Sequence, residues 1–368
     1  MELEKVLSDL GPMFEQCAPD LDRENRFAEE NFLTLRERGI YKAIIPKELG
    51  GYGVTFDELC HFLKDLAKYC PSTALTLSMH QHLVAVLVFK HLNDDETSSK
   101  TLEMISEKDL ILVSTGGGDW LSSNGSAKKV DGGYQINCVK AFCSGSPLGN
   151  VAVMSCAYND GDKESVLHFS VPLNSEGVEI IDDWDAMGMR GTGSNSIKFK
   201  DVFVPEEKIS LIRERGVWHP VWSVVSTLAF PIFIAPYFGV AEAITEKTLR
   251  IVSGRFKKDL NSFSALGRMK NHYQIAKWAL EDMVKSANNF DVKPSEETAT
   301  QAHQGKAIIA QQGRQCAQAA MEAIGGYSYY KKVEIERLYR DLLAGEFHPM
   351  QAHKQETALG EFLVTGKL

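Results

Sequence analysis

Positive charge is in short supply in this chain, and that shortage excludes one large class of partners. The 368 residues hold 40 Lys and Arg against 49 Asp and Glu, which gives a formal net charge of −9. A protein that binds nucleic acid needs a basic stripe to displace counterions from the phosphates. We therefore expect no nucleic-acid partner.

Paired cysteines and long uninterrupted apolar runs are also missing. The seven cysteines are widely spaced without a Cys-x-x-Cys pair, so we expect reduced thiols in a cytoplasmic protein and no zinc site. The N-terminus MELEKVLSDLGPMFEQ has neither a basic segment nor an apolar core, so we do not interpret it as a signal peptide. The run nearest to a membrane span, 222–244, contains two prolines, and we interpret it as a buried helix with a break.

The spacing of apolar residues divides the chain into three segments. Residues 1–110 have helical spacing, whereas 111–215 contain short stretches of β-branched and aromatic residues separated by Gly, Asn and Asp, which is typical of antiparallel strands. Helical spacing returns in 216–368, in segments near 222–253, 265–290, 297–324 and 352–365. We predict an α+β fold, mainly α, with an N-terminal helical domain, a central β-domain and a C-terminal four-helix bundle.

Several motifs occur along these segments in a fixed order. They are PKELGGYG (46–53), KAFCSG (140–145), DWDAMGMRGTGSNSIKFKDVFVPEEKI (183–209) and IGGYSYYKKVEIERLYRD (324–341). Their order and spacing resemble the acyl-CoA dehydrogenase superfamily of flavoproteins over nearly the whole chain. The resemblance implies the fold given above, a flavin cofactor, and a homotetramer or homodimer built through the last bundle.

The KAFCSG strand is the first part of the expected flavin site. A planar flavin needs an apolar wall and hydrogen-bond donors at its reactive edge. Because alternate residues of a strand face one side, we expect Phe142 and Ser144 to point together. The resemblance places Phe142, Cys143 and Ser144 at the flavin, and Ser114 and Thr115 where the family has a Thr-Glu-Pro segment that flanks flavin and substrate. The alternative is that Phe142 is a core residue and Ser144 a strand-end hydroxyl.

Two other patterns are interpreted as structural. GGGDW (116–120) lacks the Gly-x-x-x-x-Gly-Lys pattern of a phosphate loop and is expected to be a strand-end turn. His80 and His82 cannot share one helical face, so we expect no metal site there.

A glycine pair is the second part of the expected flavin site. Gly325 and Gly326 follow an apolar helical run, where a glycine commonly caps a helix. The resemblance also implies that this pair lets the backbone approach the cofactor's diphosphate. The family has a Gln shortly before the pair, where this chain has Glu322, and its Arg-x-x-Phe-Gly motif is reduced to Arg250 through Gly254. We expect the cofactor to be FAD. Because a carboxylate repels a diphosphate, FMN, which has a single phosphate, is the alternative.

The catalytic carboxylate of the dehydrogenases is missing. An acyl-CoA dehydrogenase needs a desolvated Glu to remove the α-proton of its thioester substrate. Most of the family places this Glu eight residues after the Asp of Tyr-Arg-Asp, which here is Pro349, and a branch places it near Ala229, where no acid occurs. Glu346 is the nearest acid and lies three residues too early.

His348 points to a second branch of the same fold. FCSG, DDWDAMGMR and a His at this position resemble flavin-dependent monooxygenases such as dibenzothiophene monooxygenase. That resemblance implies reduced flavin from a flavin reductase and a C4a-hydroperoxyflavin, which Ser144 and a neutral His348 would hydrogen-bond and protonate. The structural alternative is a histidine that meets free carbonyls at a helix C-terminus.

Three functions stay open at this point. We favour the monooxygenase, which would act on a small organic compound. The first alternative is an acyl-CoA dehydrogenase that uses Glu346 or another base, and the second is a scaffold without catalytic activity. We expect neither a membrane nor a metal partner.

Overall fold

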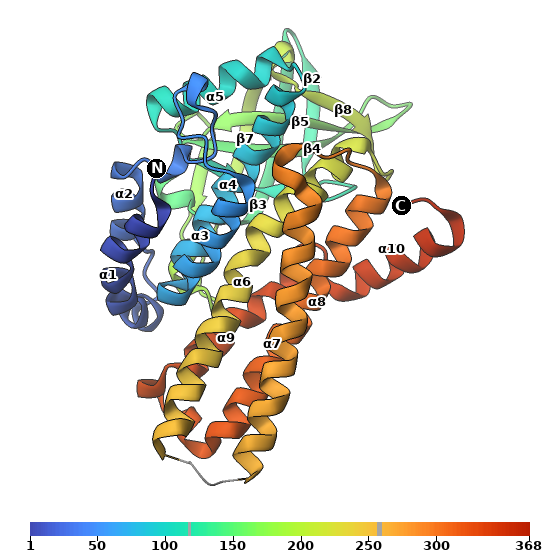
Figure 1. Cartoon of the computed structure of the whole chain (residues 1–368). Coiled ribbons are helices and arrows are strands. Elements are labelled where there is room, and N and C mark those ends of the chain that lie inside the picture. The colour runs from blue at the N-terminus through green and yellow to red at the C-terminus, as the bar shows by residue number, and fades with distance from the viewer. Residues whose placement is uncertain (117–118, 256–259) are drawn as a thin grey trace.

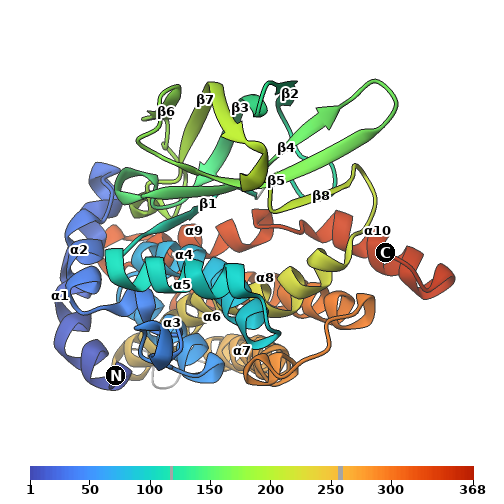
Figure 2. The same ribbon diagram turned by 90° about the horizontal axis from the view of Figure 1, so that it is seen from above.

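A β-sheet forms one layer of the molecule and helices form the other, as Figure 2 shows from above. This computed structural model describes residues 1–116, 119–255 and 260–368. The centre of the helical layer is made by α4 (Pro71–Leu92) and α6 (Pro220–Arg255), which pack against each other (Figure 1). The predicted α+β fold, mainly α, is confirmed.

The N-terminal segment is helical because its apolar residues recur at helical spacing. Its α-helices are α1 (Leu3–Glu24), α2 (Glu29–Glu37), α3 (Phe56–Tyr69), α4 and α5 (Glu96–Lys108). The start of α3 is fixed by a capping box, in which the Thr55 hydroxyl accepts from the Glu58 N–H and the Glu58 carboxylate accepts from the Thr55 N–H. Helix α4 is buried on almost every face, as expected of a central core helix.

The sheet is mixed rather than purely antiparallel. Its strands are β1 (Leu112–Ser114), β2 (Ser126–Val130), β3 (Gly133–Cys143), β4 (Val151–Asn159), β5 (Glu164–Pro172), β6 (Val178–Ile181), β7 (Asn195–Pro205) and β8 (Leu211–Glu214). They lie in the order β6-β7-β3-β2-β4-β5-β8, with β1 beside β4. Pairing of β4 with β1 and β2 is parallel, so the prediction of an antiparallel unit was wrong there. In GGGDW, residues 117–118 lie outside the described residues.

The C-terminal helices pack around α6. They are α7 (Leu260–Ala287), α8 (Glu296–Ile324), α9 (Ile335–Phe347) and α10 (Ala352–Thr365). Helix α9 contacts both α6 and α8 and completes the bundle, whereas α10 touches α8 and projects away from it (Figure 1). The predicted helical segments omitted α9, whose place in the bundle periodicity alone did not reveal.

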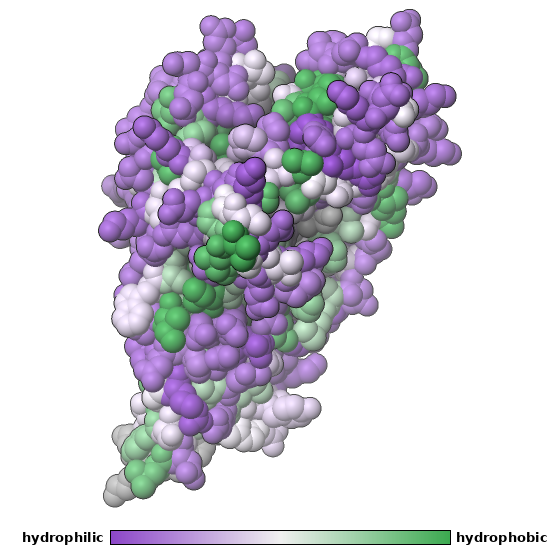
Figure 3. All heavy atoms as spheres, turned by 90° about the vertical axis from the view of Figure 1, so that its right-hand side faces the viewer, coloured by the Kyte–Doolittle hydropathy of each residue, from purple (hydrophilic) through white to green (hydrophobic). Residues whose placement is uncertain are grey.

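Helix α6 runs without interruption through Pro231 and Pro236, so the predicted break was wrong. Both α4 and α6 are long and apolar enough to cross a membrane by composition. Most of each apolar window is buried inside the fold, and both are therefore core helices. Figure 3 shows that the face on the α10 side is mostly hydrophilic, with separate hydrophobic patches.

Candidate functional site

The end of β3 presents an exposed aromatic ring. The pairing of β3 with β7 shifts register between Lys140 and Cys143, and Phe142 adopts a left-handed backbone with φ 59°. As a result Phe142 is 68% exposed, and its ring meets the edge of Trp184 at 6.1 Å. The expectation that Phe142 and Ser144 point together was wrong, because the irregularity breaks the strand alternation.

Ser144 instead points into a chain of buried hydroxyls. Its Oγ lies 2.8 Å from Ser194 Oγ, which lies 2.6 Å from Thr192 Oγ1. The Thr76 hydroxyl of α4 donates to the Thr192 carbonyl. The hydroxyl of Ser144 is therefore connected to α4 through the turn that precedes β7.

The predicted residues Ser114 and Thr115 lie at the end of β1, a strand that is anchored to α4. His80 of α4 accepts from the Leu112 N–H at Nδ1, so its Nε2 carries the proton that it donates to the Tyr41 carbonyl. Thr115 is buried and donates to the Val153 carbonyl, while Ser114 is partly buried. His80 is thus structural, and the Thr115 hydroxyl is used within the fold.

Cys143 lies in the core of the β-domain. Its thiol is fully buried and donates to the Lys140 carbonyl, and burial raises the pKa of Cys143 to about 12. The thiol therefore does not point to a ligand beside β3. A contact of Cys143 with the cofactor stays a prediction and would be made through its backbone.

His348 lies at the end of α9 in an aromatic and basic environment. Its Nδ1 is 2.7 Å from the hydroxyl of Tyr237 on α6, and its ring lies 5.2 Å from that of Phe233. Exclusion of water, together with the nearby Lys306 and His82, lowers the pKa of His348 to about 3. The imidazole is therefore neutral at ordinary pH.

A buried lysine holds the backbone of His348 and of the segment that follows it, on both sides of Pro349. Lys306 of α8 is 1% exposed, and its Nζ donates to the carbonyls of His348 and Met350 at 2.8 and 3.0 Å. Burial lowers the pKa of Lys306 to about 8. No sequence motif singled out Lys306; a Lys on an otherwise apolar and small-residue helix face was the available signal.

Glu346 is engaged in an ion pair. Its carboxylate accepts from Arg314 Nε at 2.6 Å, and both side chains are partly exposed. Of the three predicted catalytic residues, the contacts place Glu346 in a surface pair, Ser144 beside the β7 turn and His348 beside α6.

His82 is a second imidazole beside His348 that the sequence analysis dismissed. It is buried, its ring lies 6.5 Å from that of Phe233, and its Nδ1 finds no partner among the described residues. Burial lowers its pKa to about 3. Thr76 and His82 are six residues apart on α4, or about 9 Å along the axis. Helix α4 therefore links the Ser144 hydroxyl chain to the His348 environment.

The remaining predicted cofactor residues lie at the other end of the bundle. We call this end the bundle tip and define it by Arg250, Arg268, Glu322, Gly325 and Gly326. Arg250 is exposed on α6, and the exposed Glu322 pairs with Arg268 Nη2 at 2.5 Å. The N–H of Gly325 caps α8, and a Cβ on Gly325 or Gly326 would meet nothing within 4 Å.

Within one chain, the residues around His348 lie far from the bundle tip. Lys306, beside His348, and Glu322 are sixteen residues apart on the continuous helix α8, which separates them by about 24 Å along the axis. Arg268 is a tip residue that the sequence analysis missed. It opposes the charge of Glu322, so the expected repulsion of a diphosphate is offset by a cation.

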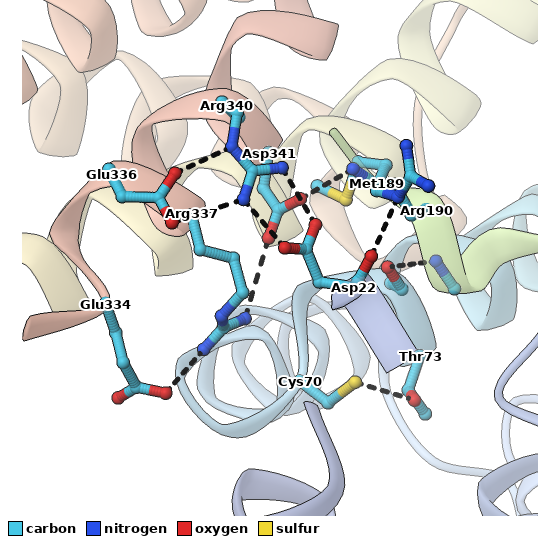
Figure 4. A network of polar contacts seen from close by, with 12 residues as sticks. Asp22, Cys70, Thr73, Met189, Arg190, Glu334, Glu336, Arg337, Arg340 and Asp341 are labelled. Atoms are coloured by element: carbon cyan, nitrogen blue, oxygen red, sulfur yellow. Dashed lines mark hydrogen bonds and ion pairs between the residues drawn. The ribbon is translucent and has the colours of Figure 1, made fainter. Parts of the chain in front are cut away.

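Figure 4 shows the polar network that fixes α9 against the rest of the fold. Arg340 pairs with Asp22 of α1 at 2.7 Å, and Asp341 accepts from the Met189 N–H at 2.5 Å. The Gly188 Cα lies so close to the Arg340 carbonyl that a Cβ would clash with it. The β-domain and α1 are thus joined to the helix that carries His348.

The described part of the chain contains no group of three His, Cys, Asp or Glu side chains that could hold a metal ion. All seven cysteines are free thiols.

Comparisons with known proteins agree with this architecture. Models of the N-terminal, middle and C-terminal domains of acyl-CoA dehydrogenase match residues 13–108, 114–202 and 232–353. The pigment production hydroxylase of a Rhodococcus species is 25% identical, covering 94% of this chain and 92% of the relative. Mitochondrial isovaleryl-CoA dehydrogenase of Arabidopsis thaliana is 23% identical, covering 88% of this chain and 81% of the relative.

A solved structure has the same fold. The FMN-bound dibenzothiophene monooxygenase TdsC of Paenibacillus sp. A11-2 superposes with a TM-score of 0.85 at 18% identity, covering 100% of this chain and 98% of that chain. The chain belongs to the acyl-CoA dehydrogenase superfamily. It is a flavin-dependent oxidoreductase of that class.

The residues present fit a flavin. Phe142 offers an exposed apolar face with Trp184 at right angles to it, as a wall for a planar ring requires. Phe142 would hold the ring, and the hydroxyl chain that ends at Ser144 would supply a donor near it.

Proposed function

We propose that this enzyme is a reduced-flavin-dependent monooxygenase that inserts one oxygen atom of O2 into a small organic substrate. The observation that carries the proposal is the neutral imidazole of His348, one residue before Pro349, which stands where most of the family has its catalytic carboxylate. An imidazole with a pKa of about 3 is a weak base and does not remove an α-proton from a thioester.

The nearby acid does not replace the missing base. To act on a substrate, Glu346 would first have to leave Arg314, whose Nε it accepts at 2.6 Å. A dehydrogenase base must instead be free and desolvated. The geometry therefore favours oxygenation over α,β-dehydrogenation.

In our proposal Tyr237 sets the proton position on His348. Burial raises the pKa of Tyr237, so its phenol stays protonated and donates to His348 Nδ1. The single imidazole proton then lies on Nε2, where it serves as a donor and general acid. Lys306 fixes the backbone of this segment, and His82 and Phe233 exclude water from one side.

A bound reduced flavin would supply the two electrons that activation of O2 requires. We propose FMN as the cofactor that a single chain can hold, which agrees with the FMN bound to TdsC. FAD would extend to a diphosphate site, for which the bundle tip of a second copy is the candidate. A homotetramer or homodimer, a separate flavin reductase and a cytoplasmic location are parts of the same proposal.

The test is rapid mixing of the protein and photoreduced FMN with oxygenated buffer. We expect an absorption transient that precedes the appearance of oxidised FMN. With no substrate to take the oxygen atom, hydrogen peroxide is released only as this transient decays. Immediate reoxidation with stoichiometric peroxide would overturn the proposal. Bleaching of bound flavin by an acyl-CoA under anaerobic conditions would establish the dehydrogenase instead, which the likeness to isovaleryl-CoA dehydrogenase makes the second candidate.

A further inference from the structure

One face of α6 carries a row of four aromatic residues and one serine. Trp222, Ser226, Phe230, Phe233 and Tyr237 are spaced by three or four residues, so they share one side of the helix. The row spans about 22 Å and ends at the His348 contact described above. It therefore leads from the β-domain to the proposed reaction centre.

Rings from other elements close over the first half of this row. We call Trp120, Trp218, Trp222, Phe230 and His303 the aromatic cluster. The Trp120 centroid lies 4.6 Å from that of Trp222, 5.7 Å from His303 and 6.0 Å from Phe230, and Trp218 lies 6.0 Å from His303. Three of the five tryptophans of the chain gather here. Such rings accommodate another planar ring through offset or edge-on packing.

The cluster is continuous with the reaction centre and reaches the surface. Phe230 lies 4.8 Å from Phe233, which in turn lies 5.2 Å from His348. Trp120 and Trp218 are partly exposed, so a ligand has access to them.

Two hydrogen-bond donors in the cluster have no partner in the part of the chain that the structure describes. The indole N–H of Trp218 donates to Ser223 at 3.3 Å. By contrast, the buried N–H groups of Trp120 and Trp222 find no acceptor among the described residues. An indole N–H is a donor only, and a buried donor without an acceptor costs about 1–3 kcal/mol. Both groups therefore call for an acceptor that the described residues do not supply.

A cation lies at the edge of the cluster. Arg213 is buried, and its guanidinium carbon lies 5.1 Å from the Trp222 ring centroid. It donates to the carbonyls of Trp120 and Leu121, which fixes the backbone that carries Trp120. Its charge favours an oxygen acceptor that is anionic or strongly polarised.

We infer that the aromatic cluster binds the organic substrate, and that this substrate is a planar aromatic or heteroaromatic ring with an oxygen acceptor. The acceptor receives the N–H groups of Trp120 and Trp222, and the ring extends along Phe230 and Phe233 toward His348. A saturated hydrocarbon chain would offer these rings no planar partner and the two N–H groups no acceptor. The inference deepens the proposed function and rests on it for the reaction, but the binding itself requires no turnover.

The test is equilibrium dialysis of three probes against the protein with oxidised FMN. They are 2-naphthoate, which has ring and acceptor, naphthalene, which has the ring alone, and cyclohexanecarboxylate, which has the acceptor alone. We expect 2-naphthoate to bind most tightly. Trp222→Phe and Trp120→Phe keep a ring and remove the N–H. Each should lower the affinity for 2-naphthoate by about five- to tenfold and the affinity for naphthalene by less than about twofold.

Trp278→Phe is the matched control, because Trp278 is 61% exposed on α7 and outside the cluster. The inference would be overturned if the wild type bound 2-naphthoate and naphthalene equally well. It would also be overturned if neither tryptophan variant lost affinity for 2-naphthoate selectively, and the two N–H groups would then be assigned to water. If one variant does not fold, the other decides. Because no O2 chemistry is measured, a failure here is distinct from failure of the flavin transient.

Discussion

The two ends of α8 differ in how complete they are within one chain. Near the start, Lys306 is 1% exposed and both of its carbonyl acceptors are present. At the bundle tip, Glu322 is exposed, and a Cβ added to Gly325 or Gly326 would meet no described atom within 4 Å. The first end is a finished site for the chemistry that we propose. The second has the form of a surface that awaits a ligand or another copy of the chain.

The largest effect is expected at the finished end. His348→Ala removes the proposed acid, so the ratio of product to O2 consumed should fall by about a hundredfold while hydrogen peroxide rises. Binding of reduced FMN should persist, because His348 acts on oxygen chemistry and not on the ring. The assay measures product and peroxide together. His353→Ala, at an exposed position on α10, is the control, and unchanged coupling in His348→Ala would remove the role of that residue.

Asp341 gives the next largest effect, in stability. Burial raises its pKa to about 6, above about 3.9 in the unfolded chain. Between these values the folded state binds a proton that the unfolded state has lost, so the free energy of unfolding falls as pH rises from about 4 to 6. Across this window Asp341→Asn should gain about 2–3 kcal/mol relative to the wild type. Urea unfolding at several pH values measures this, and parallel pH profiles would contradict the assignment.

Tyr237→Phe tests the proton position on His348. Loss of the 2.7 Å hydrogen bond frees the imidazole to take either tautomer, so coupling of O2 to product should fall by about tenfold. A merely structural role would lower the melting temperature without changing the peroxide ratio. Tyr273→Phe provides the comparison, because it removes a hydrogen bond from α7 to Glu242, which lies on α6 like Tyr237.

For the end of α8 near His348, the sequence predicts which residues take part better than it predicts their contacts. Family motifs pointed to the missing Glu and to His348, whereas helical spacing did not predict α9, the helix that ends at His348. Lys306 and Tyr237 were missed because they act across helices, and one-dimensional spacing does not say which faces meet. The place of His82 was missed for the same reason: His82 and His348 are distant in sequence, yet the rings of both contact Phe233.

Local backbone irregularity accounts for the other errors. The alternation rule predicted that Phe142 and Ser144 share a face, but the positive φ of Phe142 reverses the pattern. The parallel partners of β4 could not be predicted because strand propensity does not specify pairing. At the tip, the motif identified Gly325 and Glu322 but not the opposing Arg268.

Gly326→Ala probes the unfinished end. A Cβ there meets nothing and no positive φ is required, so stability should change by less than about 0.5 kcal/mol. If the tip approaches a cofactor diphosphate, FAD affinity should fall several-fold and FMN affinity should not. Gly325→Ala serves as the strained comparison, because its φ is +68° and substitution should cost about 1 kcal/mol. Equal responses of FAD and FMN would exclude a diphosphate at the tip.

The smallest effect is expected for Glu322→Gln. Glu322 and Arg268 form an ion pair whose side chains are 63% and 47% exposed, and solvent screens such pairs strongly. The free energy of unfolding should change by less than about 0.5 kcal/mol, which thermal melting at two protein concentrations can measure. Arg268, once released, is free to meet an anion, so FAD should bind at least as well as in the wild type. Weaker FAD binding together with a large loss of stability would mean that the pair is a structural element of the tip, and the two ends of α8 would then be equally complete.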